Sequence, residues 1–286
     1  MSALRNLAGQ TAIYGASSIG ARFLNYLLVP LYTSKGVFEP AEYGVITSLY
    51  AWTAFLNVVL TFGMETTFFR FTSNENTPLA KGSSGSVFTT ASYALLFSSL
   101  VFMLLGASLS ESIASGIGFP SHSTEVLLLV IIIGIDALTA VPMARLRQQG
   151  RAWRFASINI ISVVVNVVLN LFIFLYCMKK YNAGNSNALI DAVYDPSFGV
   201  GYVFLINLIS TGVKLVMLLP QWPAFKQFSK PLLRSMLLFG GPLMIAGLAG
   251  MVNETADRDI RCVLQTRCTY HALHPSVPHG CRTVLF

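Results

Sequence analysis

The stretch VLLLVIIIGIDALTAVPMARLRQQGRAWR, residues 126–154, decides the fold. Its first eighteen residues, Val126 to Met143, hold one charged side chain, Asp136, near the middle. An apolar run of about this length can cross the hydrocarbon core of a bilayer as a helix. Basic clusters typically follow the cytoplasmic end of such a helix, and the cluster here consists of Arg145, Arg147, Arg151 and Arg154. The stretch therefore predicts a transmembrane helix with a carboxylate near its centre.

The composition of the whole chain agrees with this interpretation. Of its 286 residues, 54% are hydrophobic and only 11% are charged, and the mean hydropathy is +0.63. About a quarter of the residues in a soluble protein are charged, so the composition argues against the alternative of a soluble domain with a large apolar core. The net charge of +7 would suggest a nucleic-acid partner in a soluble protein. In a membrane protein it indicates basic cytoplasmic loops, and we expect no nucleic acid to bind.

Further apolar runs predict an all-α integral membrane protein with about seven transmembrane helices. The first run contains Arg22 and is too long for the hydrophobic region of a signal peptide, so we interpret it as a retained span. Helices are the expected structure because they satisfy every backbone hydrogen bond within one segment. The predicted spans are 7–32, 44–69, 86–107, 124–144, 155–177, 199–220 and 235–256.

The basic residues predict the orientation of these spans. If the N-terminus is cytoplasmic, the outer connections hold only Lys35, Lys179 and Lys180. The inner side then holds Arg5, Arg70, Lys81, Arg145, Arg147, Arg151, Arg154, Lys226, Lys230 and Arg234. Loops rich in lysine and arginine stay in the cytoplasm. We therefore expect a cytoplasmic N-terminus and assign the arginines after Asp136 the role of fixing the topology.

Four predicted spans carry polar residues at steps of three or four, which places the residues of each span on one helix face. They are Thr11, Gly15, Ser18, Arg22 and Asn25; Thr53, Asn57, Thr61 and Glu65; Asn159, Ser162, Asn166 and Asn170; and Asn207, Ser210, Thr211 and Lys214. Such residues either join packed helices through hydrogen bonds or line a water-filled cavity. The pattern alone leaves both interpretations open.

Intramembrane charges favour the cavity. A charged side chain at the centre of a span costs roughly 2.5–3.5 kcal/mol on insertion scales and commonly marks an ion or substrate path. Arg22 and Asp136 lie at similar depths near the midplane, so a pair between them is possible, whereas Lys214 lies in the inner third. Glu65 lies near the inner interface, where it could equally extend to water.

Several stretches resemble polysaccharide biosynthesis proteins related to O-antigen flippases, in the multidrug/oligosaccharidyl-lipid/polysaccharide exporter superfamily. They are NLAGQTAIYGASSIGARFLNYLLVPLYT (6–33), EPAEYGVITSLYAWTAFLNVVLTFGMETTFFRF (39–71), RQQGRAWRFASINIISVVVNVVLN (147–170) and LLFGGPLMIAGLAGMVNETADR (237–258). The resemblance covers residues 1 to about 258 and implies a transporter with two lobes. It makes 1–230 an amino-terminal lobe of six spans and 231–258 the first helix of a second lobe.

The resemblance also implies a function. Such proteins flip polyprenyl-diphosphate-linked oligosaccharides across the bacterial cytoplasmic membrane for surface polysaccharide synthesis, and a cationic cavity receives the diphosphate. The expected partners are this lipid-linked sugar, the bilayer and other polysaccharide assembly proteins. The candidate ion-coupling residues are Asp136 and Glu65. The candidate substrate-binding residues are Arg22, Asn25, Asn166, Asn207 and Lys214.

Two alternatives remain open: a cation-coupled drug exporter of the same superfamily and a membrane-embedded transferase of the polysaccharide pathway. Arg22 and Lys214 favour an anionic substrate over a cationic drug. The chain contains neither a phosphate-binding glycine loop nor a metalloprotease or nucleophile-elbow motif. We therefore expect neither an enzyme nor a cofactor.

Residues 259–286 differ in character from the rest of the chain. They hold three of the four cysteines and three of the four histidines and have no apolar run long enough to span. The spacing of Cys262, Cys268, His271 and His274 does not match a standard zinc site, so we expect no metal. We expect an atypical tail, truncated or frameshifted, and hence an incomplete and inactive transporter; a genuine extramembrane tail is the alternative.

Overall fold

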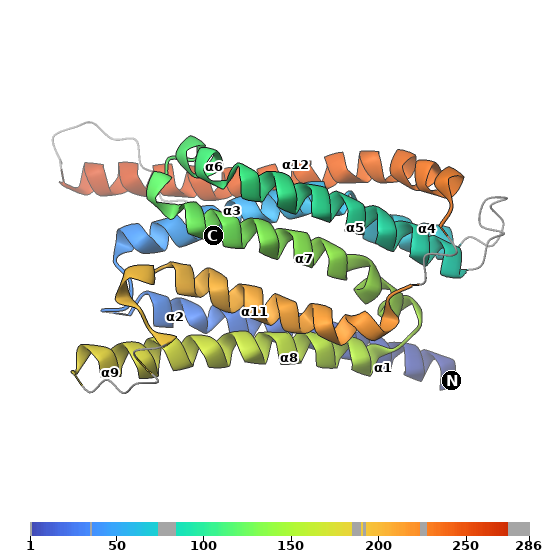
Figure 1. Ribbon diagram of the computed structural model, residues 1–286, viewed down its shortest axis with the longest axis horizontal. Coiled ribbons are helices and arrows are strands. Elements are labelled where there is room, and N and C mark those ends of the chain that lie inside the picture. The colour runs from blue at the N-terminus through green and yellow to red at the C-terminus, as the bar shows by residue number, and fades with distance from the viewer. Residues whose placement is uncertain are drawn as a thin grey trace.

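The computed structural model describes residues 2–34, 36–73, 84–184, 190, 193–223 and 228–273. For residues 2–8, 10, 21, 22, 25, 84 and 253–273 it describes the backbone alone. The regular structure in these parts is helical and forms an elongated bundle whose long helices run side by side (Figure 1). The predicted all-α fold is confirmed.

The helices occur along the chain as α1 (Ser2–Tyr26), α2 (Leu28–Tyr32), α3 (Pro40–Thr61), α4 (Met64–Ser73), α5 (Ser84–Ser108), α6 (Ser110–Gly116), α7 (Ser123–Gln148), α8 (Ala152–Asn170), α9 (Met178–Asn182), α11 (Gly201–Leu218) and α12 (Lys230–Leu273). A π-helical segment, Leu171–Cys177, joins α8 to α9. Short 3-10 turns, Pro120–His122, Pro196–Phe198 and Leu219–Gln221, lie at the ends of spans.

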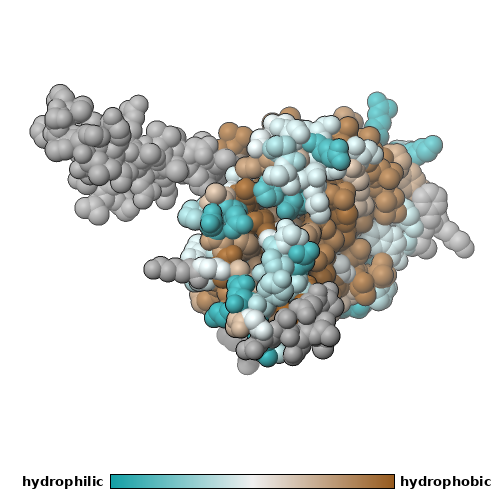
Figure 2. Space-filling view, turned by 60° about the vertical axis from the view of Figure 1, so that its left-hand side comes forward, coloured by the Kyte–Doolittle hydropathy of each residue, from teal (hydrophilic) through white to brown (hydrophobic). Residues whose placement is uncertain are grey.

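Six segments in the described residues are long and apolar enough to cross a membrane, and they coincide with six of the seven predicted spans. They are Pro40–Ser73, Gly85–Ser108, Pro120–Gln148, Ala152–Asn182, Gly201–Gln221 and Lys230–Val252. Apolar side chains cover much of the flank of the bundle, whereas hydrophilic residues gather at the end turned towards the viewer (Figure 2). Exposed Phe97, Leu104 and Leu238 suit contact with lipid. The protein is a multi-pass membrane protein.

The predicted first span, 7–32, is helical but is not among these six. It forms α1 and α2, and α1 packs along α8. Polar residues such as Gln10, Arg22 and Asn25 recur along α1 and lower its hydropathy. Its length, about 37 Å at 1.5 Å per residue, nevertheless matches the neighbouring spans.

Helix α7 is the centre of the bundle. It contacts α3, α4, α5, α6, α8 and α11 and is the most buried of the six apolar segments. Its contact with α5 depends on small residues, because a Cβ at Gly106 would lie 2.5 Å from Val130, and one at Gly134 would lie 2.5 Å from Met103. Small residues let helix backbones approach closely in membranes. The stretch that decides the fold therefore forms its core.

The second span is broken, although the sequence predicted a continuous helix over 44–69. Phe62 and Gly63 adopt left-handed conformations with φ of 51° and 61°, and they separate α3 from α4. The break packs against α12, where a Cβ at Gly240 would lie 2.6 Å from the Phe62 carbonyl oxygen. A left-handed phenylalanine is unfavourable, and the close fit of α12 holds the turn in place.

Helix α12 continues to Leu273, beyond the boundary at Arg258 expected from the change in composition. No glycine or proline occurs between Met251 and Leu273, so no residue in this stretch breaks a helix, and Pro275 follows two positions later. The expected tail is thus helical over 259–273. Residues 274–286 lie outside the described part of the chain.

The connections begin and end helices through local capping. At the start of α3, the Glu39 backbone N–H donates to the Glu42 carboxylate at 2.8 Å, and Pro40 occupies the first helical turn. Such a capping box satisfies backbone groups that the helix leaves free. On the loop before α11, the backbone N–H and hydroxyl of Ser197 donate to Asp195, and these bonds hold the pKa of Asp195 below its ordinary value.

Candidate functional site: a charged cavity between the spans

A polar cavity of about 460 Å³ lies between the α3–α4 span, α7, α8 and α11. Three of the ionisable residues predicted from the sequence line it together: Glu65, Asp136 and Lys214. Its complete lining is Asn57, Thr61, Glu65, Asp136, Thr139, Ala140, Met143, Arg147, Phe155, Asn159 and Lys214. Polar residues from four spans thus converge on one space, which supports the cavity interpretation for this part of the polar faces.

Helix α7 forms one wall of the cavity. Asp136, Ala140, Met143 and Arg147 follow each other at steps of four, three and four, so they share one helix face. At 1.5 Å per residue, Asp136 and Arg147 are separated by about 16 Å along the helix axis. The cavity therefore extends from the middle of α7 towards its connection with α8.

Arg147 is a cavity residue that the sequence analysis assigned only to topology. Its guanidinium lies 2.5 Å from the Glu65 carboxylate, and both side chains are partly exposed. The same guanidinium lies 5.5 Å from the Phe69 ring centre and 5.4 Å from that of Phe155. Its Nε atom is buried without a hydrogen-bond partner among the described residues. The helical spacing from Asp136 was the available signal for its position.

Asp136 and Lys214 form no ion pair in the described part of the chain, although they line the same cavity and attract each other across it. No carboxylate lies within 4 Å of Lys214 there, and no basic group lies within 4 Å of Asp136. The hydroxyl of Thr139 donates to the Asp136 backbone carbonyl, not to its carboxylate. Both charges are therefore available to water, an ion or a ligand in the cavity.

Asn166 and Asn207 do not line this cavity. Asn166 donates to the Ser210 hydroxyl at 3.2 Å, which joins α8 to α11. Asn207 donates to the Tyr50 hydroxyl at 3.2 Å, which joins α11 to α3. Farther along α8, the Tyr32 hydroxyl donates to Asn170 at 2.6 Å. This part of the polar faces joins helices through hydrogen bonds, the other of the two interpretations.

Arg22 and Asn25 have side chains that lie outside the described residues, so the predicted Arg22–Asp136 pair stays a prediction. Their backbone belongs to α1, which packs along α8.

The break in the second span shapes the cavity. Thr61 precedes the left-handed turn at Phe62 and Gly63, Glu65 follows it, and both line the cavity. Interrupted helices at membrane depth are tolerated where they are buried in protein or line a cavity. In secondary transporters, such helices commonly form substrate and ion sites near the midplane.

Comparison with curated proteins gave no match, and neither did comparison with solved structures. A protein family described as "Polysaccharide biosynthesis protein" matches residues 37–195, more than half of the chain. The matched segment includes Glu65, Asp136, Arg147 and Asn159 and ends before Lys214. The chain therefore belongs to the family of polysaccharide biosynthesis proteins.

Proposed function

We propose, in place of the inactive form expected from residues 259–286, that the protein moves lipid-linked oligosaccharide precursors across the bacterial cytoplasmic membrane, as a flippase for surface polysaccharide. The observation that carries this proposal is the cavity that Asp136 and Lys214 line together without forming an ion pair among the described residues. Charges within membrane spans are costly, and a packed scaffold would not need them. A carrier for an anionic lipid-linked sugar does need them, and the family description supports a polysaccharide precursor as the cargo.

Lys214 is the proposed contact for the diphosphate of the precursor. Its ammonium group can donate three hydrogen bonds, and such bonds strengthen when the acceptor is charged. Arg147 can add a bidentate contact once its ion pair with Glu65 opens. Asn166 and Asn207 act indirectly in this proposal, because they hold α8, α11 and α3 together around the cavity.

Asp136 is the proposed coupling residue, which binds a proton or a cation when the cavity changes its opening from one side of the membrane to the other. Glu65, already paired with Arg147, acts as a partner that releases Arg147 to the substrate. The orientation follows from the basic residues, with the N-terminus and the α7–α8 connection in the cytoplasm.

The test introduces Lys214→Gln into the gene at its own chromosomal position, with Lys180→Gln as the control. Lys180 carries the same charge at the opposite end of the bundle, where it lies near Tyr176. We expect Lys214→Gln to abolish surface polysaccharide, with the lipid-linked precursor accumulating and the protein level unchanged. The control should behave as wild type.

Two outcomes would contradict the proposal. Normal surface polysaccharide from Lys214→Gln would remove Lys214 from the mechanism. Loss of polysaccharide without accumulation of the precursor would indicate a defect in synthesis, as expected for a transferase of the pathway, and not in transport.

A further inference from the structure

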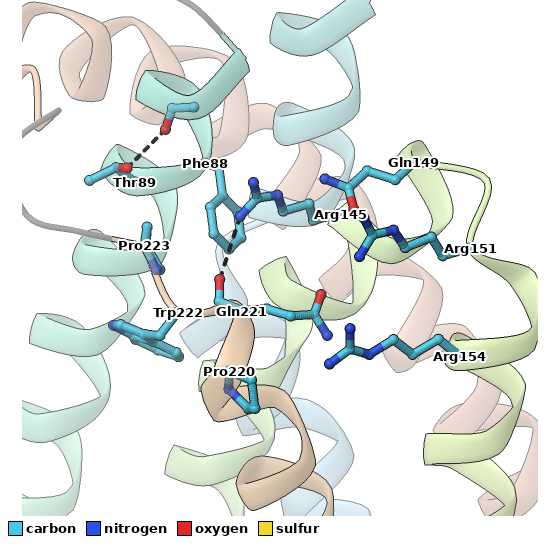
Figure 3. Close-up of a pocket in the computed structure, with 11 residues that line it drawn as sticks. Phe88, Thr89, Arg145, Gln149, Arg151, Arg154, Pro220, Gln221, Trp222 and Pro223 are labelled. Atoms are coloured by element: carbon cyan, nitrogen blue, oxygen red, sulfur yellow. Dashed lines mark hydrogen bonds between the residues drawn. The ribbon is translucent and has the colours of Figure 1, made fainter.

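A second cavity, of about 420 Å³, lies at the end of the bundle where α7 connects to α8 (Figure 3). Arg145, Arg151 and Arg154 line it together with the amide side chains of Gln149 and Gln221 and the ring of Trp222. The start of α5 and the turn after α11 complete it. None of the lining residues is acidic. We call this cavity the basic pocket.

Arg145 is held in a fixed position in the basic pocket. Its guanidinium carbon lies 4.0 Å from the centre of the Phe88 ring, and one of its amino groups donates to the Gln221 backbone carbonyl at 3.4 Å. Arg151 and Arg154 extend towards the same space from the start of α8 (Figure 3). Neither pairs with a carboxylate among the residues whose side chains are described. Three like charges thus converge without an anion between them.

An unsatisfied donor adds an independent observation. The side-chain nitrogen of Gln221 is buried and has no hydrogen-bond partner in the described structure. Its amide points towards Arg154 across the pocket (Figure 3). A buried donor without an acceptor costs about 1–3 kcal/mol, so a ligand that offers acceptor oxygens here would gain a bond that the protein leaves unmade.

The basic pocket is separate from the charged cavity. Arg145 and Arg147 are two residues apart on α7 and therefore point about 200° apart around the helix. Arg145 lines the basic pocket, and Arg147 lines the charged cavity. The inference below therefore does not rest on the proposed flippase activity.

We propose that the basic pocket binds the phosphate group of an anion. Guanidinium groups match phosphate oxygens in bidentate geometry and are the preferred partners in such sites. The pocket lies where the apolar segments Pro120–Gln148 and Gly201–Gln221 end, and Trp222 is a residue type that suits a membrane interface. Basic pockets between transmembrane helices on the cytoplasmic side bind anionic headgroups. The favoured source of the phosphate is thus an anionic phospholipid, and a soluble phosphate compound is the second source.

The test measures binding to the purified full chain and to the double variant Arg151→Gln/Arg154→Gln. Both arginines are exposed, so the double variant should fold. The matched control, Lys230→Gln/Arg234→Gln, removes the same charge from exposed positions at the start of α12 that line neither cavity. One arm titrates inorganic pyrophosphate in neutral detergent. The other compares nanodiscs of phosphatidylcholine with nanodiscs that also contain phosphatidylglycerol, and it counts retained phosphatidylglycerol by native mass spectrometry.

We expect wild type and control to retain phosphatidylglycerol and the double variant to bind it at least about tenfold more weakly, because two charge-assisted contacts are lost. Binding of pyrophosphate with the same dependence on the arginines would confirm the phosphate site and assign it to a soluble ligand. Absence of binding in both arms would overturn the proposal. So would equal losses in the double variant and the control, because net charge alone would then explain the binding.

Discussion

Two arginines that are two residues apart on α7 have different surroundings. Arg147 pairs with Glu65 in the charged cavity, and Arg145 stacks on Phe88 in the basic pocket. Arginines at one end of a span are what the positive-inside rule predicts for a cytoplasmic end. It does not explain their division between two cavities, which follows from the 100° that each residue turns around a helix. Position around the helix, more than sequence proximity, thus distinguishes their roles.

Asp136 allows a test at the residue scale that separates function from stability. Its carboxylate makes no hydrogen bond or ion pair with the described residues, so Asp136→Asn removes an acidic group without breaking a direct contact. A charge at the centre of a span costs roughly 2.5–3.5 kcal/mol. We therefore expect an equal or higher melting temperature in detergent, together with loss of surface polysaccharide. A strongly destabilised Asp136→Asn protein would show that the carboxylate has a structural partner.

At the scale of elements, the contact between α12 and the broken second span is a close one between two backbones. The turn at Phe62 and Gly63 lies directly against Gly240. The sequence assigned α12 to a second lobe. Through this contact, α12 is joined to the wall of the charged cavity. Movement of α12 would therefore reach Thr61 and Glu65 through the turn.

Gly240→Ala tests this contact. The added Cβ would lie 2.6 Å from the Phe62 carbonyl oxygen, so α12 or the turn must shift. Overpacking of this kind costs typically 1–3 kcal/mol, and we expect a lower free energy of unfolding in detergent. The control is Gly250→Ala, where a Cβ would meet nothing within 4 Å and alanine favours the helix. Equal stability of the two variants would contradict the close packing at Gly240.

The sequence predicted the elements better than it predicted their interruptions. Apolar runs located six spans within a few residues, because length and hydropathy determine what crosses a bilayer. The sequence did not predict the break at Phe62, because the left-handed turn there depends on α12, which lies far away in the sequence. The helical continuation of α12 to Leu273 was also not predicted. The change in composition after Arg258 was given more weight than the absence of glycine and proline from this stretch.

The candidate site was predicted in part for a similar reason. Glu65, Asp136 and Lys214 were found because a charge in an apolar run is conspicuous. Arg147 was missed because it follows the apolar run, where a topological role is sufficient. Asn166 and Asn207 could not be assigned from the sequence, because polar residues on a helix face are compatible with both a cavity and a helix contact.

At the scale of the whole molecule, the orientation in the membrane can be measured. Asn182 and Gln149 are exposed at opposite ends of the α8 span. In a background with Cys262, Cys268 and Cys281 replaced by serine, a membrane-impermeant thiol reagent should label Asn182→Cys in intact cells. It should label Gln149→Cys only after permeabilisation. The native Cys177 is buried and should not react. The reverse pattern would invert the topology.

The transbilayer position of the lipid-linked precursor tests the central claim, that the charged cavity carries this precursor across the membrane. The measurement adds an impermeant lectin to spheroplasts and follows the precursor that becomes accessible in the outer leaflet over time. We predict that the precursor appears there in wild-type and Lys180→Gln cells and stays inaccessible in Lys214→Gln cells that contain the same amount of protein. Equal rates of appearance in Lys214→Gln and wild-type cells would contradict the account.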